Sequence, residues 1–219
     1  MEIVFRMRLM VWLALLGTLA LSGYAVAGGD AAGGRPTEYS GPVAEIPELQ
    51  AGQTWTFALS NGDDWKVELR EVSADKRTLV TTPFVNYPPG CDGCLTVMDR
   101  NGVILKVTDS KDKRLRAFDY ATGWKPLDFP LWVGKKWKFY AFWLVDGTSV
   151  QYLSERKVAA YEEIDVPAGR FNAFRIDVAT SSPEWFGRET YWYALEVGTI
   201  IKRTGESPGD YKLKSFTKP

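Results

Sequence analysis

The chain has 219 residues, of which 45% are hydrophobic and 14% aromatic, and it carries 27 basic and 27 acidic side chains. This composition excludes a disordered or collagen-like chain, and the balanced charge excludes a protein that binds nucleic acid through bulk charge. The chain contains no histidine. Ser-His-Asp and Cys-His nucleophile pairs, imidazole metal ligands and histidine general bases are therefore excluded as well.

The first 27 residues have the pattern of a secretory signal peptide. Arg6 and Arg8 precede an apolar run over residues 9–21, and the small residues of Ala25-Val26-Ala27 then offer a cleavage site. An uncleaved membrane anchor is the alternative, but the apolar run is shorter than the roughly 20 residues of a spanning helix. Tyr24 stands where a lipobox would carry its cysteine, which argues against lipidation. We therefore expect a periplasmic or secreted protein without a stable membrane span after cleavage.

Residues 28–50 follow the signal peptide and are predicted to form a flexible tether. The stretch over residues 28–36 is rich in glycine and lacks apolar periodicity, so it cannot bury enough surface to fix its backbone. The remaining residues, 51–219, have the length of a single β domain.

The first predicted hairpin follows the tether. Apolar side chains alternate with polar ones over residues 54–59 and again over residues 65–70, and Asn61-Gly62 lies between the two runs. Alternation with a period of two is typical of strands with one solvated face.

Cys91 and Cys94 come next and are the only cysteines in the chain. In an exported protein this Cys-x-x-Cys pair favours a disulfide that staples a loop. A redox centre is a second interpretation, but residues 95–98 read as a strand rather than the helix that would stabilise a thiolate. A zinc site is the third, and it would need ligands beyond these two cysteines.

Further strands follow in hairpins to the end of the chain. Turn signals stand at Asn101-Gly102, at Asp146-Gly147 and at Pro167-Ala168-Gly169. The flanking predicted strands cover residues 95–99, 103–107, 135–145, 149–160, 161–166, 171–180, 188–197, 199–203 and 211–216. We expect an all-β fold, an antiparallel meander of about ten strands that forms a strongly curved sheet or an open (half) barrel.

Three segments of the C-terminal half resemble a known family. Residues 130–137, 166–171 and 191–203 follow the succession VGxxW, VPAGxF and WYAxxVGxVK. This succession resembles an uncharacterised family of exported bacterial proteins that looks like the curved half-barrels of the periplasmic lipoprotein-carrier superfamily. The resemblance covers residues 130–216 and implies a fold. It brings no activity and no catalytic residues.

Catalytic motifs are missing from the sequence. The chain has neither a phosphate-binding glycine loop nor a nucleophile elbow. Glu162, Glu163 and Asp165 could supply paired carboxylates for a glycosidase, but a solvated acidic strand face explains them more simply. We therefore expect a protein that is not an enzyme, without catalytic residues, metal or cofactor.

Aromatic side chains are the strongest remaining signal. In the strand predicted over residues 135–145 both faces are apolar, and the strand around residue 192 repeats the pattern. Either a curled sheet buries one face and covers the other with a second layer, or one face holds an apolar ligand. Stacking on sugars and docking of a protein are further options. The candidate ligand-binding residues are Trp137, Phe139, Tyr140, Trp143, Tyr191, Trp192 and Tyr193.

These observations favour a non-enzymatic binding module of the cell envelope for an apolar or amphiphilic, lipid-like ligand. The first alternative is a structural or protein-docking envelope domain without a small-molecule ligand. A carbohydrate-binding or carbohydrate-acting protein is the second alternative.

Overall fold

Twelve β-strands follow one another along the chain in the computed structural model, which describes residues 35–74, 78–81, 95–108, 114–118, 124–145, 148–206 and 209–219. The strands are β1 (Thr54–Leu59), β2 (Asp64–Val72), β3 (Thr78–Thr81), β4 (Leu95–Asp99), β5 (Ile104–Thr108), β6 (Arg114–Phe118), β7 (Lys136–Val145), β8 (Thr148–Val166), β9 (Gly169–Ser182), β10 (Trp185–Ala194), β11 (Thr199–Gly205) and β12 (Tyr211–Thr217). The described part of the chain contains no helix.

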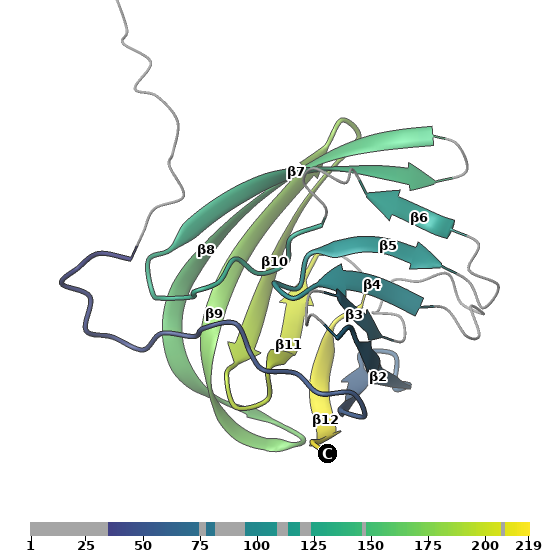
Figure 1. Cartoon of the computed structure of the whole chain (residues 1–219). Helices are drawn as coiled ribbons and strands as arrows, with labels where there is room; N and C mark the ends of the chain where they lie inside the picture. The colour runs from purple at the N-terminus through teal and green to yellow at the C-terminus, as the bar shows by residue number, and fades with distance from the viewer. Residues whose placement is uncertain are drawn as a thin grey trace, which may run out of the picture. The chain divides into compact units, whose positions relative to one another are not determined.

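Each strand pairs antiparallel with its neighbours in the sequence. Strand β1 pairs with β2 on one side and with β12 on the other, so that the order of paired strands returns to its start. Figure 1 shows the result as a strongly curved sheet in which the long strands β7–β10 face the shorter strands β2–β5. The prediction of an all-β antiparallel meander in a strongly curved sheet is confirmed.

The long strand β8 replaces two predicted strands. The sequence suggested a break near residue 160, but β8 continues through residues 148–166 with a register shift against β9 between Val158 and Ala160. Such a bulge bends a strand without ending it. The following turn does occur where Pro167 and Gly169 predict it, and Gly169 has a φ of +133°, a value that L side chains rarely adopt.

Several predictions fall on residues that lie outside the described ranges. They are the signal peptide over residues 1–27, the first part of the tether, the pair Cys91 and Cys94, and the turn at Asp146-Gly147. Within the described ranges, no helix has the length and apolar character needed to cross a membrane.

The second half of the predicted tether packs on the sheet. We call residues 43–49 the strap. Ala44 is fully buried, its N–H donates to Leu131 O at 3.0 Å, and its carbonyl accepts from Leu131 N at 2.8 Å. Leu49 packs against the core on the inner face. Figure 1 shows this part of the chain crossing in front of the strands, so the folded unit begins upstream of residue 51.

A second segment, residues 124–135, also crosses the sheet, and we call it the insert. Trp124 and Ile104 of β5 exchange two backbone hydrogen bonds, and Leu131 exchanges two with Ala44 of the strap. Leu127, Leu131 and Trp132 are buried. The strap and the insert therefore join the packed interior although neither contributes a strand to the sheet.

Side chains from the inner face and from the two crossing segments form the core. Its largest fully buried members are Tyr193, Phe174, Leu69, Leu131, Ile176, Ile201 and Leu213. Burial of large apolar side chains is the main term that stabilises such a sheet.

Removal of the strap tests its contribution to folding. A chain that starts at residue 51 loses both hydrogen bonds of Ala44 and the burial of Ala44 and Leu49, and we expect its free energy of unfolding to fall by about 3 kcal/mol. Chemical denaturation followed by circular dichroism measures this change. A chain that starts at residue 35 is the control and should unfold like one that starts at residue 28. Equal stability of all three chains would contradict the structural role of the strap.

Candidate functional site

A cavity of about 90 Å³ lies between strands β1–β4, the strap, the insert and the start of β11. We call it the inner cavity. Its wall is mostly apolar and includes the rings of Trp55, Phe57 and Phe129. The full lining is Pro47, Leu49, Trp55, Phe57, Val67, Leu69, Thr81, Met98, Arg100, Gly102, Pro126, Leu127, Phe129, Gly198, Thr199 and Ile200. Arg100 is exposed, so part of this wall reaches the molecular surface.

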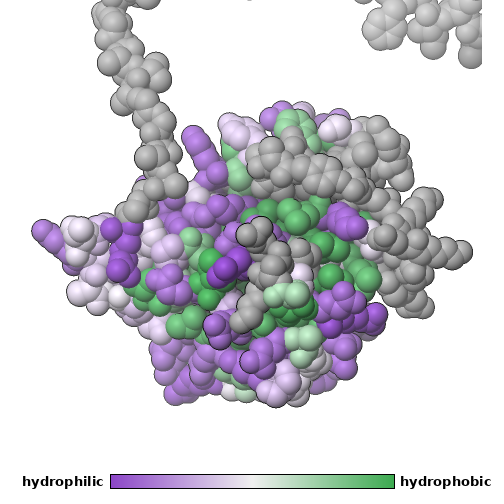
Figure 2. Space-filling model, viewed as in Figure 1, coloured by the Kyte–Doolittle hydropathy of each residue, from purple (hydrophilic) through white to green (hydrophobic). Residues whose placement is uncertain are grey.

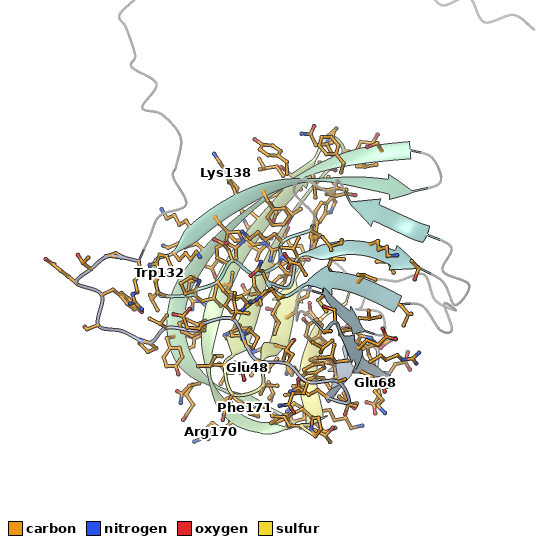
Figure 3. The ribbon with its side chains drawn as sticks, in the orientation of Figure 1. Glu48, Glu68, Trp132, Lys138, Arg170 and Phe171 are labelled. Atoms are coloured by element: carbon orange, nitrogen blue, oxygen red, sulfur yellow. The ribbon has the colours of Figure 1, made fainter. Side chains whose placement is uncertain are left out.

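A larger outer groove of about 320 Å³ lies on the other side of the strap. Its lining is Val43, Glu45, Ile46, Pro47, Glu48, Leu49, Gln53, Leu195, Val197, Gly198 and Lys218. Pro47, Leu49 and Gly198 line both concavities, which makes the strap the partition between them. Figure 2 shows hydrophobic residues gathered at the centre of this face inside a hydrophilic frame, and Figure 3 places Glu48 near the centre of the same view.

Gly198 closes this partition at the turn between β10 and β11. Its φ is +78°, and its N–H donates to Ala194 O at 2.9 Å. A Cβ atom at this position would come within 3.2 Å of Leu49 Cδ2. Glycine is required here both by the backbone conformation and by the close approach of the strap.

Charged side chains order the insert internally, and one arginine of the sheet binds it. Lys135 is buried, its Nζ lies 2.9 Å from Asp128 Oδ2, and it donates to Pro130 O at 3.0 Å. Lys125 also pairs with Asp128. From the sheet, Arg156 Nη1 donates to Pro126 O at 2.7 Å. These contacts fix the segment whose side chains cover one side of the cavity.

Asp128 is the acidic centre of the contacts within the insert. Burial alone would raise the pKa of its carboxyl, but the hydrogen bonds and charges of Lys125 and Lys135 outweigh burial and place this pKa below its ordinary value of 3.8. The ionised form is therefore stabilised in the folded protein.

A second charged cluster lies inside the curved sheet. Arg203 and Glu189 form an ion pair whose side chains are only 7% and 8% exposed. Tyr191 Oη donates to Glu189 Oε2 at 2.5 Å, and Arg203 Nη1 donates to Gly209 O at 3.1 Å. Burial lowers the pKa of Arg203, but the bond to Glu189 outweighs burial and leaves this pKa raised. Burial raises the pKa of Tyr191, because the charged form of a phenol is the anion. The hydroxyl of Tyr191 therefore stays protonated and can donate.

Arg156 is the third buried charge of this interior and is 3% exposed. Its Nε donates to Ser154 Oγ at 3.2 Å, and its guanidinium carbon lies 5.3 Å from the ring centre of Phe139 and 5.1 Å from that of Tyr191. Burial lowers its pKa. The hydroxyl of Tyr191 and the charge of Glu189 act in the opposite direction on this pKa, but burial outweighs them.

Of the predicted ligand-binding residues whose side chains the structure describes, none lines either concavity. Phe139, Tyr191 and Tyr193 are buried in the core, and Trp137 packs against it while donating from Nε1 to Lys125 O at 3.5 Å. Tyr140 is 46% exposed.

Trp192 is half-buried, and its Nε1 donates to Glu162 Oε1 at 2.8 Å. Lys202 Nζ lies 4.4 Å from the centre of the Trp192 ring. The side chain of Trp143 lies outside the described part of the structure. The predicted ligand-binding residues are therefore not gathered in one place: some lie in the core, and others lie on the outer surface.

Sequence reasoning missed the residues that do line the inner cavity. The alternation in β1 and β2 marks Trp55, Phe57, Val67 and Leu69 as one face of a hairpin, which is a usable signal. The contributions of the strap and the insert had no such signal, because those segments lack strand periodicity.

The carboxylates considered for catalysis lie in surface ion pairs. Glu163 and Asp165 both contact Arg170, at 3.5 and 3.0 Å, and all three side chains are more than half exposed. Glu162 contacts Arg175 at 3.6 Å besides its bond to Trp192. This arrangement agrees with the solvated face that the sequence favoured.

Comparison with known proteins gives likeness of fold alone. No protein-family model and no curated protein matches the chain. A Bacteroides fragilis protein with a YmcC-like fold, provisionally assigned as exported, has a TM-score of 0.47 and 13% identity and covers 80% of this chain and 100% of its own. The hypothetical lipoprotein YmcC of Escherichia coli K12 has a TM-score of 0.47 and 17% identity, over 80% of this chain and 87% of its own. A provisionally assigned lipoprotein of Parabacteroides distasonis has a TM-score of 0.44 and 11% identity, over 80% of this chain and 99% of its own. At these values no statement about function carries over.

The buried ion pair can be tested against a matched surface pair. Glu189→Gln leaves Arg203 buried without its carboxylate, and we expect the free energy of unfolding to fall by about 3 kcal/mol. Asp165→Asn breaks an exposed pair with Arg170 and should cause no measurable change, because solvent screens it. Denaturant titration at neutral pH compares the two. A similar small effect of both substitutions would contradict the structural role of the cluster.

The stabilisation that Asp128 gives to the insert should depend on pH. Because the pKa of Asp128 is lowered on folding, its contribution to stability is fully present above the unfolded value and is lost as the pH falls through the folded value. The difference in unfolding free energy between the unmodified protein and Asp128→Asn should therefore be constant above about pH 5 and shrink below about pH 4. Denaturant titrations from pH 3 to 7 measure this difference. A difference that grew on acidification would contradict a lowered pKa of Asp128 in the folded protein.

Proposed function

We propose that this protein is an exported, non-enzymatic binding module for an apolar or amphiphilic ligand of the cell envelope. The observation that carries the proposal is the inner cavity, whose wall combines apolar side chains from four strands, the strap and the insert. Ligand pockets in proteins are typically concave, mostly apolar and equipped with a few polar groups. Thr81, Arg100 and Thr199 are the polar groups of this wall.

The size of the cavity limits the part of the ligand that is enclosed. A volume of about 90 Å³ accommodates a short stretch of hydrocarbon and not a whole lipid. The exposed Arg100 places one part of the wall at the surface, where the remainder of a longer ligand can leave. Export is supported by the signal peptide pattern, and the absence of histidine from the sequence supports a role without catalysis.

The alternative of a protein-docking domain has one observation in its favour. Tyr140, Leu153, Ser181 and Phe186 are successive neighbours across β7, β8, β9 and β10. Tyr140 and Phe186 in this row are 46% and 52% exposed. Exposed apolar side chains on one face of a sheet are a feature of docking surfaces.

Filling the cavity tests the binding function. Ile200→Phe places a larger side chain in the cavity wall and should weaken binding of decan-1-ol at least about tenfold, because the site can no longer close around hydrocarbon. Ile164→Phe is the matched control, since Ile164 is also half-buried but lines neither concavity. Isothermal titration calorimetry measures both.

Native mass spectrometry of protein purified from the envelope adds an independent readout. Bound apolar molecules should be retained by the unmodified protein and lost in Ile200→Phe. If the unmodified protein carries no ligand and binds neither decan-1-ol nor decanoate, the binding function is wrong and the docking alternative is favoured.

A further inference from the structure

Exposed aromatic side chains gather near the β7–β8 and β9–β10 turns. Six large apolar side chains are exposed in the described part of the chain, and four of them belong to this region. They are Tyr140 and Phe142 on β7 and Trp185 and Phe186 on β10, and we call them the aromatic tip. Tyr140 and Phe186 stand in one cross-strand row, three strand spacings or about 14 Å apart. The exposed rings therefore form a band across four strands.

The β9–β10 hairpin carries exposed rings on both of its faces. Trp185 and Phe186 are consecutive in β10, so their side chains point to opposite sides of the strand. They are 41% and 52% exposed. Trp185 pairs with Ser182, which leaves two residues for the turn, and Figure 1 shows this turn at the upper end of the sheet. A flat partner would cover one of these faces, whereas a fluid phase can surround the turn and cover both.

Contacts within β10 hold both rings in place outside the core. A Cβ atom at Gly187 would overlap the indole ring of Trp185, so this ring lies against the bare backbone of the glycine. The ring centre of Phe186 lies 5.0 Å from the guanidinium carbon of Arg188, within the range of a cation–π contact. The two rings are thus ordered before any partner arrives, which lowers the entropy cost of binding.

A band of positive charge lies beside the rings on the outer face. Lys138 and Arg188 are each two residues from a ring of the cross-strand row, and a step of two residues keeps the face of a strand. Lys136 and Lys157 are paired with each other in the next row. All four side chains are exposed, and Figure 3 shows Lys138 on the outer side of the curved sheet.

Acidic side chains offset this charge only in part. Glu155 stands opposite Lys138, and Asp177 Oδ1 lies 3.6 Å from Arg175 Nε. Glu184 is exposed in the β9–β10 turn. The cations of the band therefore outnumber the carboxylates around it.

We infer that the aromatic tip is a peripheral anchor for the surface of an anionic lipid bilayer. Tryptophan and tyrosine are the side chains enriched at the level of lipid headgroups. Lysine and arginine beside such rings attract the phosphates of anionic lipids. The order of rings first and cations behind them matches the change from acyl chains to headgroups. This anchor lies outside the inner cavity and goes beyond the proposed binding function.

A protein partner fits the aromatic tip less well than a bilayer does. Protein interfaces are depleted in lysine, yet lysines supply three of the four cations in the band. A protein partner would also leave one of the two faces of the β9–β10 turn uncovered. A bilayer accepts both features, because long cationic side chains reach the headgroups while rings enter the apolar boundary.

Sedimentation with sucrose-loaded vesicles tests the anchor. We expect the exported chain to bind vesicles of equal parts phosphatidylcholine and phosphatidylglycerol at least about tenfold more tightly than vesicles of phosphatidylcholine alone. High salt should reduce this preference, because it screens exposed charges. Equal binding to both kinds of vesicle would overturn the anionic assignment, and binding to neither would overturn the anchor and leave the rings to a protein partner.

Substitution of the rings tests which side chains contact the lipid. Trp185→Ser combined with Phe186→Ser should weaken binding to the mixed vesicles at least about tenfold. Leu195→Ser is the matched control, because Leu195 is 46% exposed and follows the other end of β10, and it should leave binding unchanged. Circular dichroism checks that each variant is folded. Equal binding by the double variant and the unmodified protein would overturn the anchor.

Fluorescence quenching gives a second readout at the tip. Lipids with brominated acyl chains quench tryptophans that enter the bilayer, so Trp185→Phe should remove most of the quenching seen with the unmodified protein. Unchanged quenching in this variant would contradict insertion of the β9–β10 turn.

Substitution of the cations tests the charge. Lys138→Gln combined with Arg188→Gln should remove most of the preference for the mixed vesicles and leave binding to phosphatidylcholine unchanged. Lys212→Gln combined with Lys214→Gln removes the same charge from exposed positions of β12 and is the control. An equal loss of preference in both double variants would show that net charge alone acts, and would overturn the role of the band.

The anchor and the inner cavity can fail separately. Ile200→Phe, which fills the cavity wall, should bind vesicles like the unmodified protein, because Ile200 lies outside the aromatic tip. Loss of vesicle binding in Ile200→Phe would mean that the cavity and not the tip takes up lipid, and would overturn the anchor.

Discussion

The burial of one face of a twelve-stranded curved sheet is the constraint on which the rest of the structure depends. A sheet that encloses so much space needs side chains to fill it, since packed interiors tolerate few voids. The strands supply aromatic residues such as Trp55 and Phe139, and the strap and the insert supply the remainder, among them Leu49 and Phe129. The inner cavity is the space that these contributions leave between them.

Charge inside this apolar volume is compensated to different degrees. Arg203 has Glu189, and Lys135 has Asp128, so that these cations carry little penalty. Arg156 is bonded to a carbonyl and a hydroxyl and surrounded by rings. The hydroxyl of Tyr191 and the charge of Glu189 offset part of the cost of burying this cation.

Much of the fold could be predicted from the sequence, because strand alternation and turn chemistry are local. Asn61-Gly62, Asn101-Gly102 and Pro167 to Gly169 all stand at turns. The site could be predicted only in part. The sequence places Trp137 and Tyr191 on strands whose two faces are both apolar, yet which face borders a void depends on the strap and the insert. Their positions follow from contacts such as Ala44 with Leu131, which are distant in sequence and leave no local pattern. The burial of Arg156 could not be predicted either, because it depends on the strand register that places this residue opposite Trp137.

The pairing of β1 with β12 joins residues from opposite ends of the folded unit, as in the pair Thr54 and Thr217. Every other pairing joins strands that are adjacent in sequence and can form as the chain lengthens. One edge of β1 must therefore wait, with its backbone groups unpaired, until β12 is available. An exposed strand edge is a site for wrong association between chains. The same adjacency of the two ends means that a linker could join them and new ends could be opened at another hairpin, which makes this sheet a natural subject for circular permutation.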